Sequence, residues 1–311
     1  MVQYARRLGE SGYVAQARDV LQAAVPRADR AFGHDAPLTL TVRAHLAAWT
    51  AEAGDVITAR DEYAVLLPIY ERIFGAQHPE TLITRRELAV LTGWAGDPAS
   101  ACAQTQSLRA LRERLSGIEH PDTQAARRDE AHWIGMAGDA AGARDQFAEL
   151  VPVAERVLGA AHPNTLTARR LLAYWTGMAG DAAGARDQFA ALVPVAERAL
   201  GARNPKVLSS RRHLASWTGK AGDAPGARNQ FAELLPVAER VLGAEHQDTL
   251  ANRRSLAHWT AAAGEPAAAR DQLAALLPVY ERVLGPEHPD TLAARRELAE
   301  WAEGTDRFHA M

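Results

Sequence analysis

The sequence predicts an all-α protein of about fifteen helices, built as a solenoid of helical hairpins. Three observations support this prediction. Glycine recurs with a period of 42 residues along the chain, and the residues between the glycines have the spacing of helices. A hairpin of this size cannot bury its own apolar face, so that neighbouring hairpins must stack to form a core.

Two glycine series and one alanine series share the same step of 42 residues. They run through seven periods without an insertion, which leaves little room for chance. A chain of 311 residues could hold two globular domains, but this regularity favours one elongated array. The series run from Gly12 to Gly264, from Gly33 to Gly285 and from Ala17 to Ala269.

One unit illustrates the two helices that are expected in each. Helix A is expected over residues 165–180, TLTARRLLAYWTGMAG, and Gly180 ends it. Pro163 lies at its start, where a missing N–H costs nothing. Thr165 or Asn164 can cap the helix with a side-chain oxygen.

Helix B is expected over residues 182–200, AAGARDQFAALVPVAERAL. Gly201 stops it in the manner of a C′ glycine. A proline lies near the middle of helix B in six units, and we expect a bend at each. These prolines are Pro26, Pro68, Pro152, Pro194, Pro236 and Pro278.

Composition and charge exclude several classes of protein. The formal net charge is −3, so that no overall basic field indicates nucleic acid. The one cysteine, Cys102, allows neither an internal disulfide nor a cysteine metal site. No apolar run approaches the roughly 18 residues of a membrane helix, and the N-terminus lacks the apolar core of a signal peptide. We therefore expect a cytoplasmic protein that does not bind membranes.

Small and apolar residues at fixed positions of the hairpin form a signature. They are Leu172 and Ala173 in helix A, and Ala185 and Phe189 in helix B. These residues resemble the signature of the tetratricopeptide repeat (TPR) family. The 42-residue period and the linker residues are similar to the kinesin light chain variant of that repeat, and similar arrays occur in bacterial signalling ATPases. The linker residues are Leu158, Gly159, His162 and Pro163.

The resemblance covers nearly the whole chain, and it implies a right-handed superhelix over residues 1–304 with a tail over 305–311. In such arrays helix A lines a concave groove where peptides bind. The chain departs from the common repeat at three positions. Arg169 stands where that repeat has tryptophan, Thr176 stands where it has tyrosine, and Trp175 lies one position earlier.

The two ends of the array differ. Residues 1–11 are only the end of a helix A. Either the chain begins with a short natural cap, or it was cut from a longer protein. The last helix A carries Glu297, Glu300 and Glu303 on surfaces that a further repeat would cover, so that we expect the array to end there.

The copies of the unit separate scaffold positions from positions that are free to contact a ligand. A residue type kept in every unit serves stacking, whereas a position that changes can serve a partner. At about 100° per residue, the recurring positions of helix A share one arc, which we expect to be buried. They are Leu166, Arg169, Leu172, Ala173 and Thr176. A second, mostly variable arc holds Thr167, Arg170, Leu171, Tyr174 and Met178.

The variable arc supplies the predicted partner-binding residues. Acidic, aromatic, histidine and methionine side chains occupy it in different units. The candidates are Glu87, Trp94, Asp129, His132, Met136, Tyr174, Met178, His213 and His258.

One arginine recurs on this variable arc in six units. The set is Arg86, Arg128, Arg170, Arg212, Arg254 and Arg296. Arginine binds carboxylates and phosphates in a bidentate way, so that a ladder of arginines could hold an acidic peptide, a C-terminal carboxylate or a phosphorylated segment. Alternatively, each arginine pairs with a neighbouring acid such as Glu87 or Asp129. Both interpretations stay open.

The arginine at the Arg169 position is present in all seven full units and lies on the buried arc. A buried charge needs a partner, and helix B carries an acid at one constant position. We therefore predict one buried or half-buried ion pair per repeat. The pairs are Arg43 with Asp29, Arg85 with Glu71, Arg127 with Glu113, Arg169 with Glu155, Arg211 with Glu197, Arg253 with Glu239, and Arg295 with Glu281.

A linker histidine recurs in five units. Successive units lie about two helix widths apart, which is too far for these histidines to share a zinc ion. We therefore expect no metal site, and we expect the histidines to help cap the next helix. They are His78, His120, His162, His246 and His288.

Residues 91–130 break the pattern. Leu91 replaces a tryptophan, and Trp94 follows three residues later. Either this unit has drifted, or it forms the contact surface for a partner. The other replacements are Cys102, Ala103, Thr105, Ala110, Gln124 and Glu130.

Catalytic motifs find little support in the sequence. It has no Walker pattern, no nucleophile elbow and no acid pair that stands outside the repeat. We expect no enzyme and no cofactor, but a module that binds a peptide or partner segment, acidic or phosphorylated in character, in bacterial regulation or signalling. Two alternatives stay open, a sensor of an anionic small molecule or nucleotide and a self-assembling scaffold.

Overall fold

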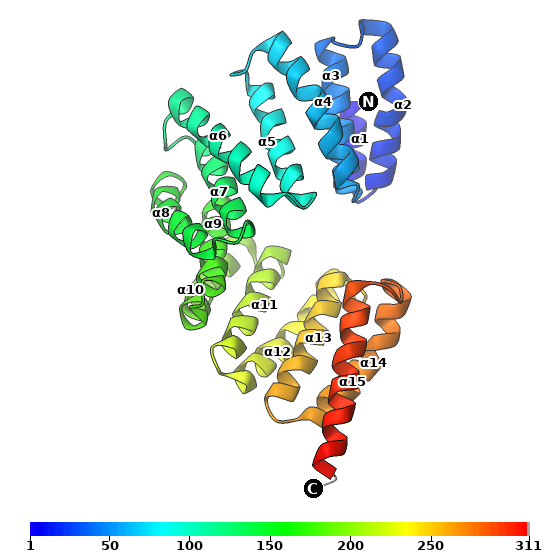
Figure 1. Ribbon diagram of the computed structural model, residues 1–311, viewed down its shortest axis with the longest axis vertical. Coiled ribbons are helices and arrows are strands. Elements are labelled where there is room, and N and C mark those ends of the chain that lie inside the picture. Colours follow the sequence, from blue (N-terminus) through cyan, green and yellow to red (C-terminus); the bar gives the residue numbers. More distant parts are fainter. Residues whose placement is uncertain (310–311) are drawn as a thin grey trace. The chain divides into compact units, whose positions relative to one another are not determined.

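The computed structural model describes the backbone of residues 1–309 and the side chains of residues 1–9 and 11–301. Within the described backbone the chain forms fifteen helices and no strand, which confirms the predicted all-α class (Figure 1). The helices A are α1 (Val2–Glu10), α3 (Pro37–Glu52), α5 (Pro79–Trp94), α7 (Pro121–Met136), α9 (Pro163–Met178), α11 (Pro205–Lys220), α13 (Gln247–Ala262) and α15 (Pro289–His309). The helices B are α2 (Val14–Phe32), α4 (Val56–Phe74), α6 (Pro98–Ser116), α8 (Ala140–Leu158), α10 (Ala182–Leu200), α12 (Ala224–Leu242) and α14 (Pro266–Val283).

The last helix extends beyond the expected end of the array, because α15 continues to His309. The side chain of Glu303 and residues 310–311 of the expected tail lie outside the described part of the chain. The chain forms two compact units, Met1–Gln146 and Phe147–Met311.

Within each of the two compact units, helices that follow one another in sequence pack together, as α5 does with α6 and α10 with α11. Successive helices A also touch, as α5 does with α7 and α9 with α11. The helices A of one unit therefore lie side by side, and their side chains can meet from one repeat to the next.

The glycines of both series form the predicted turns. Gly180, after helix A, has a φ of 101°, and Gly201, after helix B, has a φ of 86°. Side chains other than hydrogen are strained in this left-handed region. Gly201 is the C-cap of α10, as predicted. Pro194 lies inside the continuous helix α10, and the bend expected at that proline stays a prediction.

The start of helix A differs from the expectation. α9 begins at Pro163, and its N-cap is His162 rather than Thr165 or Asn164. The buried Thr165 hydroxyl instead donates to the carbonyl oxygen of Ala154 in helix B, at 3.3 Å. The expectation was wrong because an imidazole nitrogen takes the place of the hydroxyl or carboxylate oxygen that usually caps a helix.

The core of each repeat is formed by small and large side chains that alternate. Between α9, α10 and α11 the buried Ala173 and Ala185 let the helices approach closely, and Phe189 and Leu192 fill the space beside them. Burying each large apolar side chain contributes about 1.5–3 kcal/mol relative to exposure. Of the predicted buried arc, Leu166, Ala173 and Thr176 are buried, whereas Arg169 and Leu172 are only partly buried.

A tryptophan of one helix A packs closely against a glycine of the preceding helix A. The Trp217 ring of α11 lies against Gly177 of α9, where a Cβ atom would stand 2.4 Å from the ring. In the compact unit Met1–Gln146, Trp133 lies in the same way against Gly93. Leu91 packs close to Ala51, where the glycine is absent. Ala51 and Leu91 thus stand where the pairs above have glycine and tryptophan.

Candidate functional site

The predicted scaffold pairs between helix A and helix B are confirmed in five repeats. Each arginine of the Arg169 position meets its helix B carboxylate across 14 residues of sequence, and the side chains are half-buried. At this exposure each pair contributes less than about 1 kcal/mol. The pairs are Arg85–Glu71 at 2.6 Å, Arg169–Glu155 at 3.8 Å, Arg211–Glu197 at 2.5 Å, Arg253–Glu239 at 2.6 Å and Arg295–Glu281 at 2.6 Å.

The first repeat departs from this pattern of ion pairs. Arg43 lies 3.9 Å from Glu62 and hydrogen-bonds to His34 at 2.8 Å. Asp29, the acid expected to pair with it, meets His34 at 3.4 Å. An aspartate is one methylene shorter than the glutamates that complete the other pairs, so that its carboxylate stays on the helix B side.

The linker histidines cap the helices that follow them, as predicted. In each case Nδ1 accepts a hydrogen bond from the backbone N–H two residues later, at 3.1–3.3 Å. The five histidines are His78, His120, His162, His246 and His288. Asn204 caps α11 in the same way with its side-chain oxygen, at 2.9 Å.

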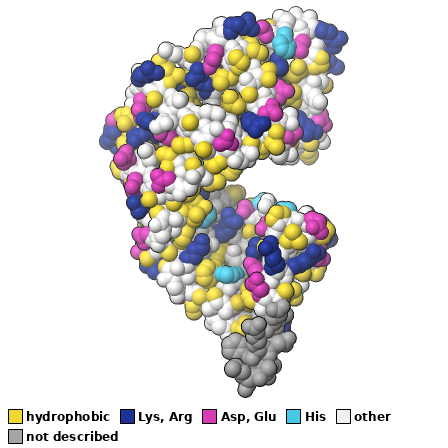
Figure 2. Space-filling view, in the orientation of Figure 1, with side chains coloured by type: hydrophobic (Ala, Val, Ile, Leu, Met, Phe, Trp, Pro, Cys, Tyr) yellow, Lys and Arg dark blue, Asp and Glu magenta, His cyan; other side chains and the backbone are white. Residues whose placement is uncertain are grey.

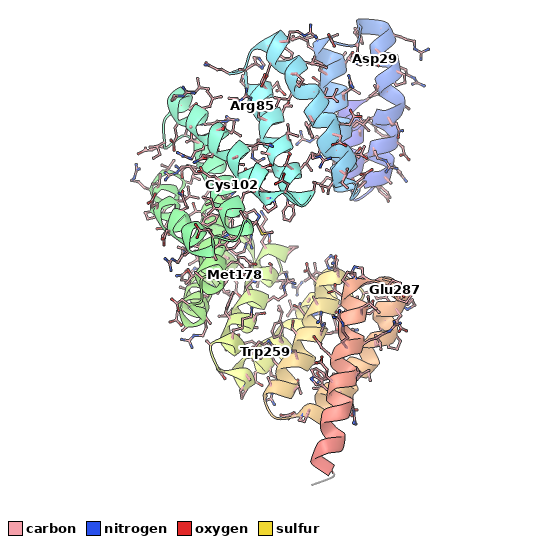
Figure 3. The ribbon with its side chains drawn as sticks, viewed as in Figure 1. Asp29, Arg85, Cys102, Met178, Trp259 and Glu287 are labelled. Carbon is pink, nitrogen blue, oxygen red and sulfur yellow. The ribbon has the colours of Figure 1, made fainter. Side chains whose placement is uncertain are left out.

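The ends of three helices A expose large apolar side chains on the variable arc. Trp94 is 59% exposed, Met136 is 45% exposed, and Met178 is 48% exposed. Met178 is labelled in Figure 3. The Trp94 ring lies edge-on to Trp133, with 5.5 Å between ring centroids. It is also tilted against His132 at 6.1 Å. These side chains are held in place by the scaffold but are not covered by it.

The other aromatic and histidine candidates are partly covered. The ring of Tyr174 lies edge-on to His213, with 5.8 Å between centroids. The ring of His213 also stacks on Phe189 of helix B at 5.4 Å. His258 is exposed and lies against Trp259. Charged side chains of both signs are dispersed among hydrophobic ones on the surface seen in Figure 2.

The arginines of the ladder are not equivalent. Arg86 donates to Asp129, which follows it by 43 residues, at 2.7 Å. Arg254 donates at 2.5 Å to Glu297, at the same separation. Asp129 is itself buried, so that its carboxylate neutralises an arginine rather than facing a partner. At these positions the arginines are therefore paired internally, as the alternative interpretation predicts.

Three further arginines of the ladder have other partners. Arg128 lies 3.0 Å from Asp129, the residue beside it. Arg212 lies 3.3 Å from Asp248, which follows it by 36 residues. Arg296 donates to the carbonyl oxygen of Leu292 in its own helix.

Arg170 differs from all of these. Among the residues that the structure describes, no carboxylate, carbonyl or hydroxyl group binds its guanidinium. Burial and the neighbouring Arg212 lower the pKa of Arg170. Burial, and then Arg212, Arg170 and Lys220, lower the pKa of His213 to about 3, so that this imidazole is neutral at pH 7. The junction of α9 and α11 therefore carries, at Arg170, a positive charge that no described carboxylate neutralises.

The polar replacements in the irregular region, residues 91–130, have partners within that region. Glu130 is buried and pairs with Arg109 of α6. The side-chain amide of Gln124 donates to the carbonyl oxygen of Ile118, and the buried Thr105 hydroxyl donates to its own helix. These polar side chains are used inside the unit, and so they are not available to a partner.

Sequence comparison of the units missed two features of this surface. One is the contact of tryptophan with glycine, and the other is the separation of 36 or 43 residues between an arginine and its acid. Both signals are present in the sequence, because acids at Asp122, Asp129, Asp290 and Glu297 stand at those separations from Arg86 and Arg254. Only the contacts between successive helices A show that residues at these separations lie next to each other. No helix in the described part of the chain is long and apolar enough to cross a membrane.

Comparisons with known proteins identify the repeat. The family model of the tetratricopeptide repeat matches residues 39–80, 207–248 and 249–290. No curated protein sequence matches the chain. A Podosopora anserina structure named for kinesin light chain nearly identical TPR-like repeats is 22% identical, with a TM-score of 0.60, and covers 66% of this chain and 97% of that one.

Two other solved structures belong to sensor proteins. A Signal Transduction ATPase with Numerous Domains from Pyrococcus horikoshii, which has a tetratricopeptide repeat sensor, is 13% identical with a TM-score of 0.62, and covers 90% of this chain and 41% of that one. The quorum sensor NprR from B. thuringiensis is 11% identical with a TM-score of 0.62, and covers 96% of this chain and 77% of that one. At these identities the likeness shows the fold.

Proposed function

We propose that this chain, which is a tetratricopeptide repeat protein with repeats of the kinesin light chain type, binds a peptide or a segment of a partner protein on the variable arc of its helices A. One observation carries the proposal. Large apolar side chains stand exposed on this arc, whereas the recurring side chains of the same helices are used for stacking.

Trp94 is the strongest anchor of this surface. Tryptophan is enriched among the residues that carry most of the binding energy in protein interfaces. Its ring is fixed from one side by Trp133 and leaves 59% of its surface exposed. Met136, at the same position of the next helix A, supplies a flexible apolar contact of the kind used at adaptable binding surfaces. Together they fit an apolar side chain of a bound segment.

The wider setting of this activity is proposed by analogy. The sensor part of the ATPase and the quorum sensor support a role in regulation or signalling. We place this role in a bacterial cytoplasm and assign no catalysis to the chain. Because unrelated functions share one fold, this setting rests on the likeness alone. The proposal gives the bound segment an anionic group as well as an apolar anchor.

Affinity capture with quantitative mass spectrometry tests the proposal. The wild-type chain, Trp94→Ala and Ile57→Ala are immobilised and exposed to an extract of the organism that makes the protein. Ile57 is the matched control, since it is an apolar residue of helix B with 58% exposure. A specific partner should be lost on Trp94→Ala and retained on Ile57→Ala. A partner retained equally by both variants would contradict the proposal, as would self-association in light scattering without any partner.

A further inference from the structure

We propose that the surface between α9 and α11 is a binding site for one carboxylate or phosphate group, with Arg170 as its central residue. The proposal rests on the proposed function and deepens it, because the anionic group would belong to the bound segment. It places the charged part of the ligand at one junction of helices A and not along a ladder of six arginines.

The first argument is the separation between an arginine and its internal acids. Three arginines of this position meet a carboxylate 36 or 43 residues later, namely Arg86, Arg212 and Arg254. Arg254 meets both, Asp290 at 3.6 Å and Glu297 at 2.5 Å. At the corresponding positions after Arg170 the chain has Lys206 and His213. Both internal acceptors are therefore missing, and one is replaced by a cation.

The second argument is the charge around the junction. The chain has only two lysines, and both lie on α11, as Lys206 and Lys220. Arg212 of the same helix has one acid, Asp248, whose side chain is 51% exposed and so screens the charge weakly. Burial lowers the pKa of His213 to about 3, so that its imidazole is neutral at pH 7 and does not neutralise the cations beside it. Apart from the scaffold pairs, the cations of α9 and α11 thus have one exposed carboxylate, Asp248, among their described contacts.

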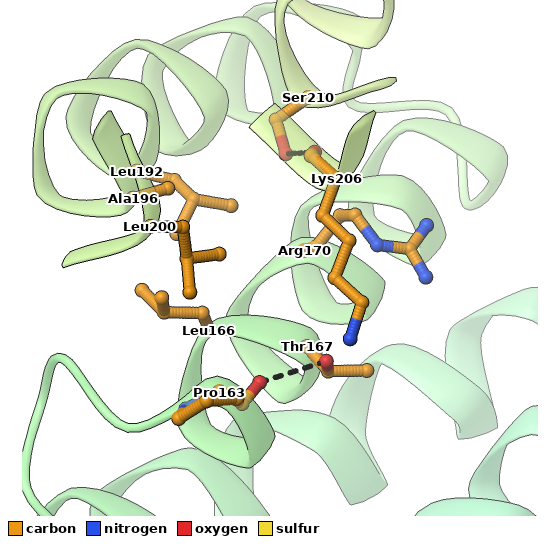
Figure 4. A pocket seen from close by; sticks show the side chains of 9 residues that line it. All are labelled: Pro163, Leu166, Thr167, Arg170, Leu192, Ala196, Leu200, Lys206 and Ser210. Carbon is orange, nitrogen blue, oxygen red and sulfur yellow. Dashed lines mark hydrogen bonds between the residues drawn. The ribbon is translucent and has the colours of Figure 1, made fainter. Parts of the chain in front are cut away.

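The third argument is the shape of the surface beside Arg170. Lys206 extends along the same pocket as Arg170, and Leu166, Leu192 and Leu200 form the opposite wall (Figure 4). The cavity between them has a volume of about 20 Å³, which holds little more than one water molecule. A larger group must bind at the mouth, where it meets the cations, because Leu166 and Leu192 are buried in the core.

The chemistry of the ligand follows from these side chains. A half-buried guanidinium loses hydration without gaining a partner, and this cost is removed when an anion binds. Guanidinium forms two parallel hydrogen bonds to a carboxylate or to a phosphate, whereas ammonium adds charge with less directional preference. Both kinds of anion satisfy Arg170, so that the site selects the bound segment by its anionic group.

Nuclear magnetic resonance of the arginine Nε–H groups tests the site on the full chain. Inorganic phosphate and sodium acetate are added separately at constant ionic strength, with chloride as the reference anion. The Arg170 signal is expected to move in a saturable way, and the Arg254 signal is expected to stay in place because its acids are internal. A saturable response to either anion supports the site, and the anion that binds more tightly identifies the kind of group. No response to either anion beyond that to chloride overturns the proposal.

A pair of variants separates the site from general charge effects. His213→Glu restores the acid that other repeats have at this separation, and should weaken phosphate or acetate binding by about tenfold or more. Ala190→Glu adds the same charge at an exposed position of α10, and should leave the affinity within about twofold. Equal affinities in the two variants, with both folded by circular dichroism, would overturn the proposal.

Neither titration contains a partner, so that its outcome is independent of the capture experiment with Trp94→Ala. Anion binding at Arg170 without any captured partner would contradict the proposed function and leave a site for a free anion. A captured partner without anion binding would contradict the site alone.

Discussion

The contact between Trp217 and Gly177 predicts that a larger residue at the glycine destabilises the stack. In an exposed helix interior, Gly→Ala stabilises by about 1 kcal/mol, because alanine has the higher helix propensity. At Gly177 the new Cβ would stand 2.4 Å from the indole ring. Trp217 is 5% exposed and enclosed by the core of its repeat, so that the ring has little room to move.

Overpacking of this kind costs about 1–3 kcal/mol. Against the gain in propensity, Gly177→Ala should therefore lower the free energy of unfolding by up to about 2 kcal/mol. Trp217→Leu alone should cost about 2–4 kcal/mol, since it leaves a cavity. The double variant copies the natural pair of Ala51 and Leu91, and should be more stable than the sum of the single changes by about 1–3 kcal/mol.

Urea unfolding followed by circular dichroism measures the global effect. Because a repeat array need not unfold in two states, hydrogen exchange of the amides in α11 measures the local effect. Ala51→Gly is the control, and should cost about 1 kcal/mol, since that position faces Leu91 and not a tryptophan ring. The reasoning is refuted if Gly177→Ala is as stable as the wild-type chain, or more stable.

Three further predictions follow from single contacts. The pKa of His213 is about 3 in the folded chain against an ordinary value near 6.5, so that the unfolded chain binds the proton first as the pH falls. The free energy of unfolding should therefore drop below pH ~6.5 by up to about 1.4 kcal/mol per pH unit. His213→Gln should remove this pH dependence in urea titrations at several pH values. Glu197→Gln breaks the half-exposed pair with Arg211 and should cost less than about 1 kcal/mol by thermal unfolding; a larger loss would mean that these pairs hold the repeats together. His162→Ala removes the N-cap of α9 and should cost about 0.5–2 kcal/mol, measured as faster hydrogen exchange of the first-turn amides; unchanged exchange would show that the imidazole does not cap.

The sequence by itself determined the hairpin, its period and its turns. These features depend on local chemistry that each copy repeats, such as the left-handed glycine at Gly180 and the cap at His162. It also determined five of the scaffold pairs of the Arg169 position, because in those repeats the arginine and its glutamate lie within one hairpin. Comparison of copies is enough where the same contact is made in every copy.

Tertiary structure decided which arginines of the variable arc are free. Whether such an arginine has a counter-charge depends on residues of the next helix A. Their separation of 36 or 43 residues is set by the offset between neighbouring repeats, as Arg254 shows. No periodicity within one unit contains that offset. The same reason explains why the contact of Trp217 with Gly177 is visible only when the helices are stacked, since each residue alone resembles a common feature of a helix.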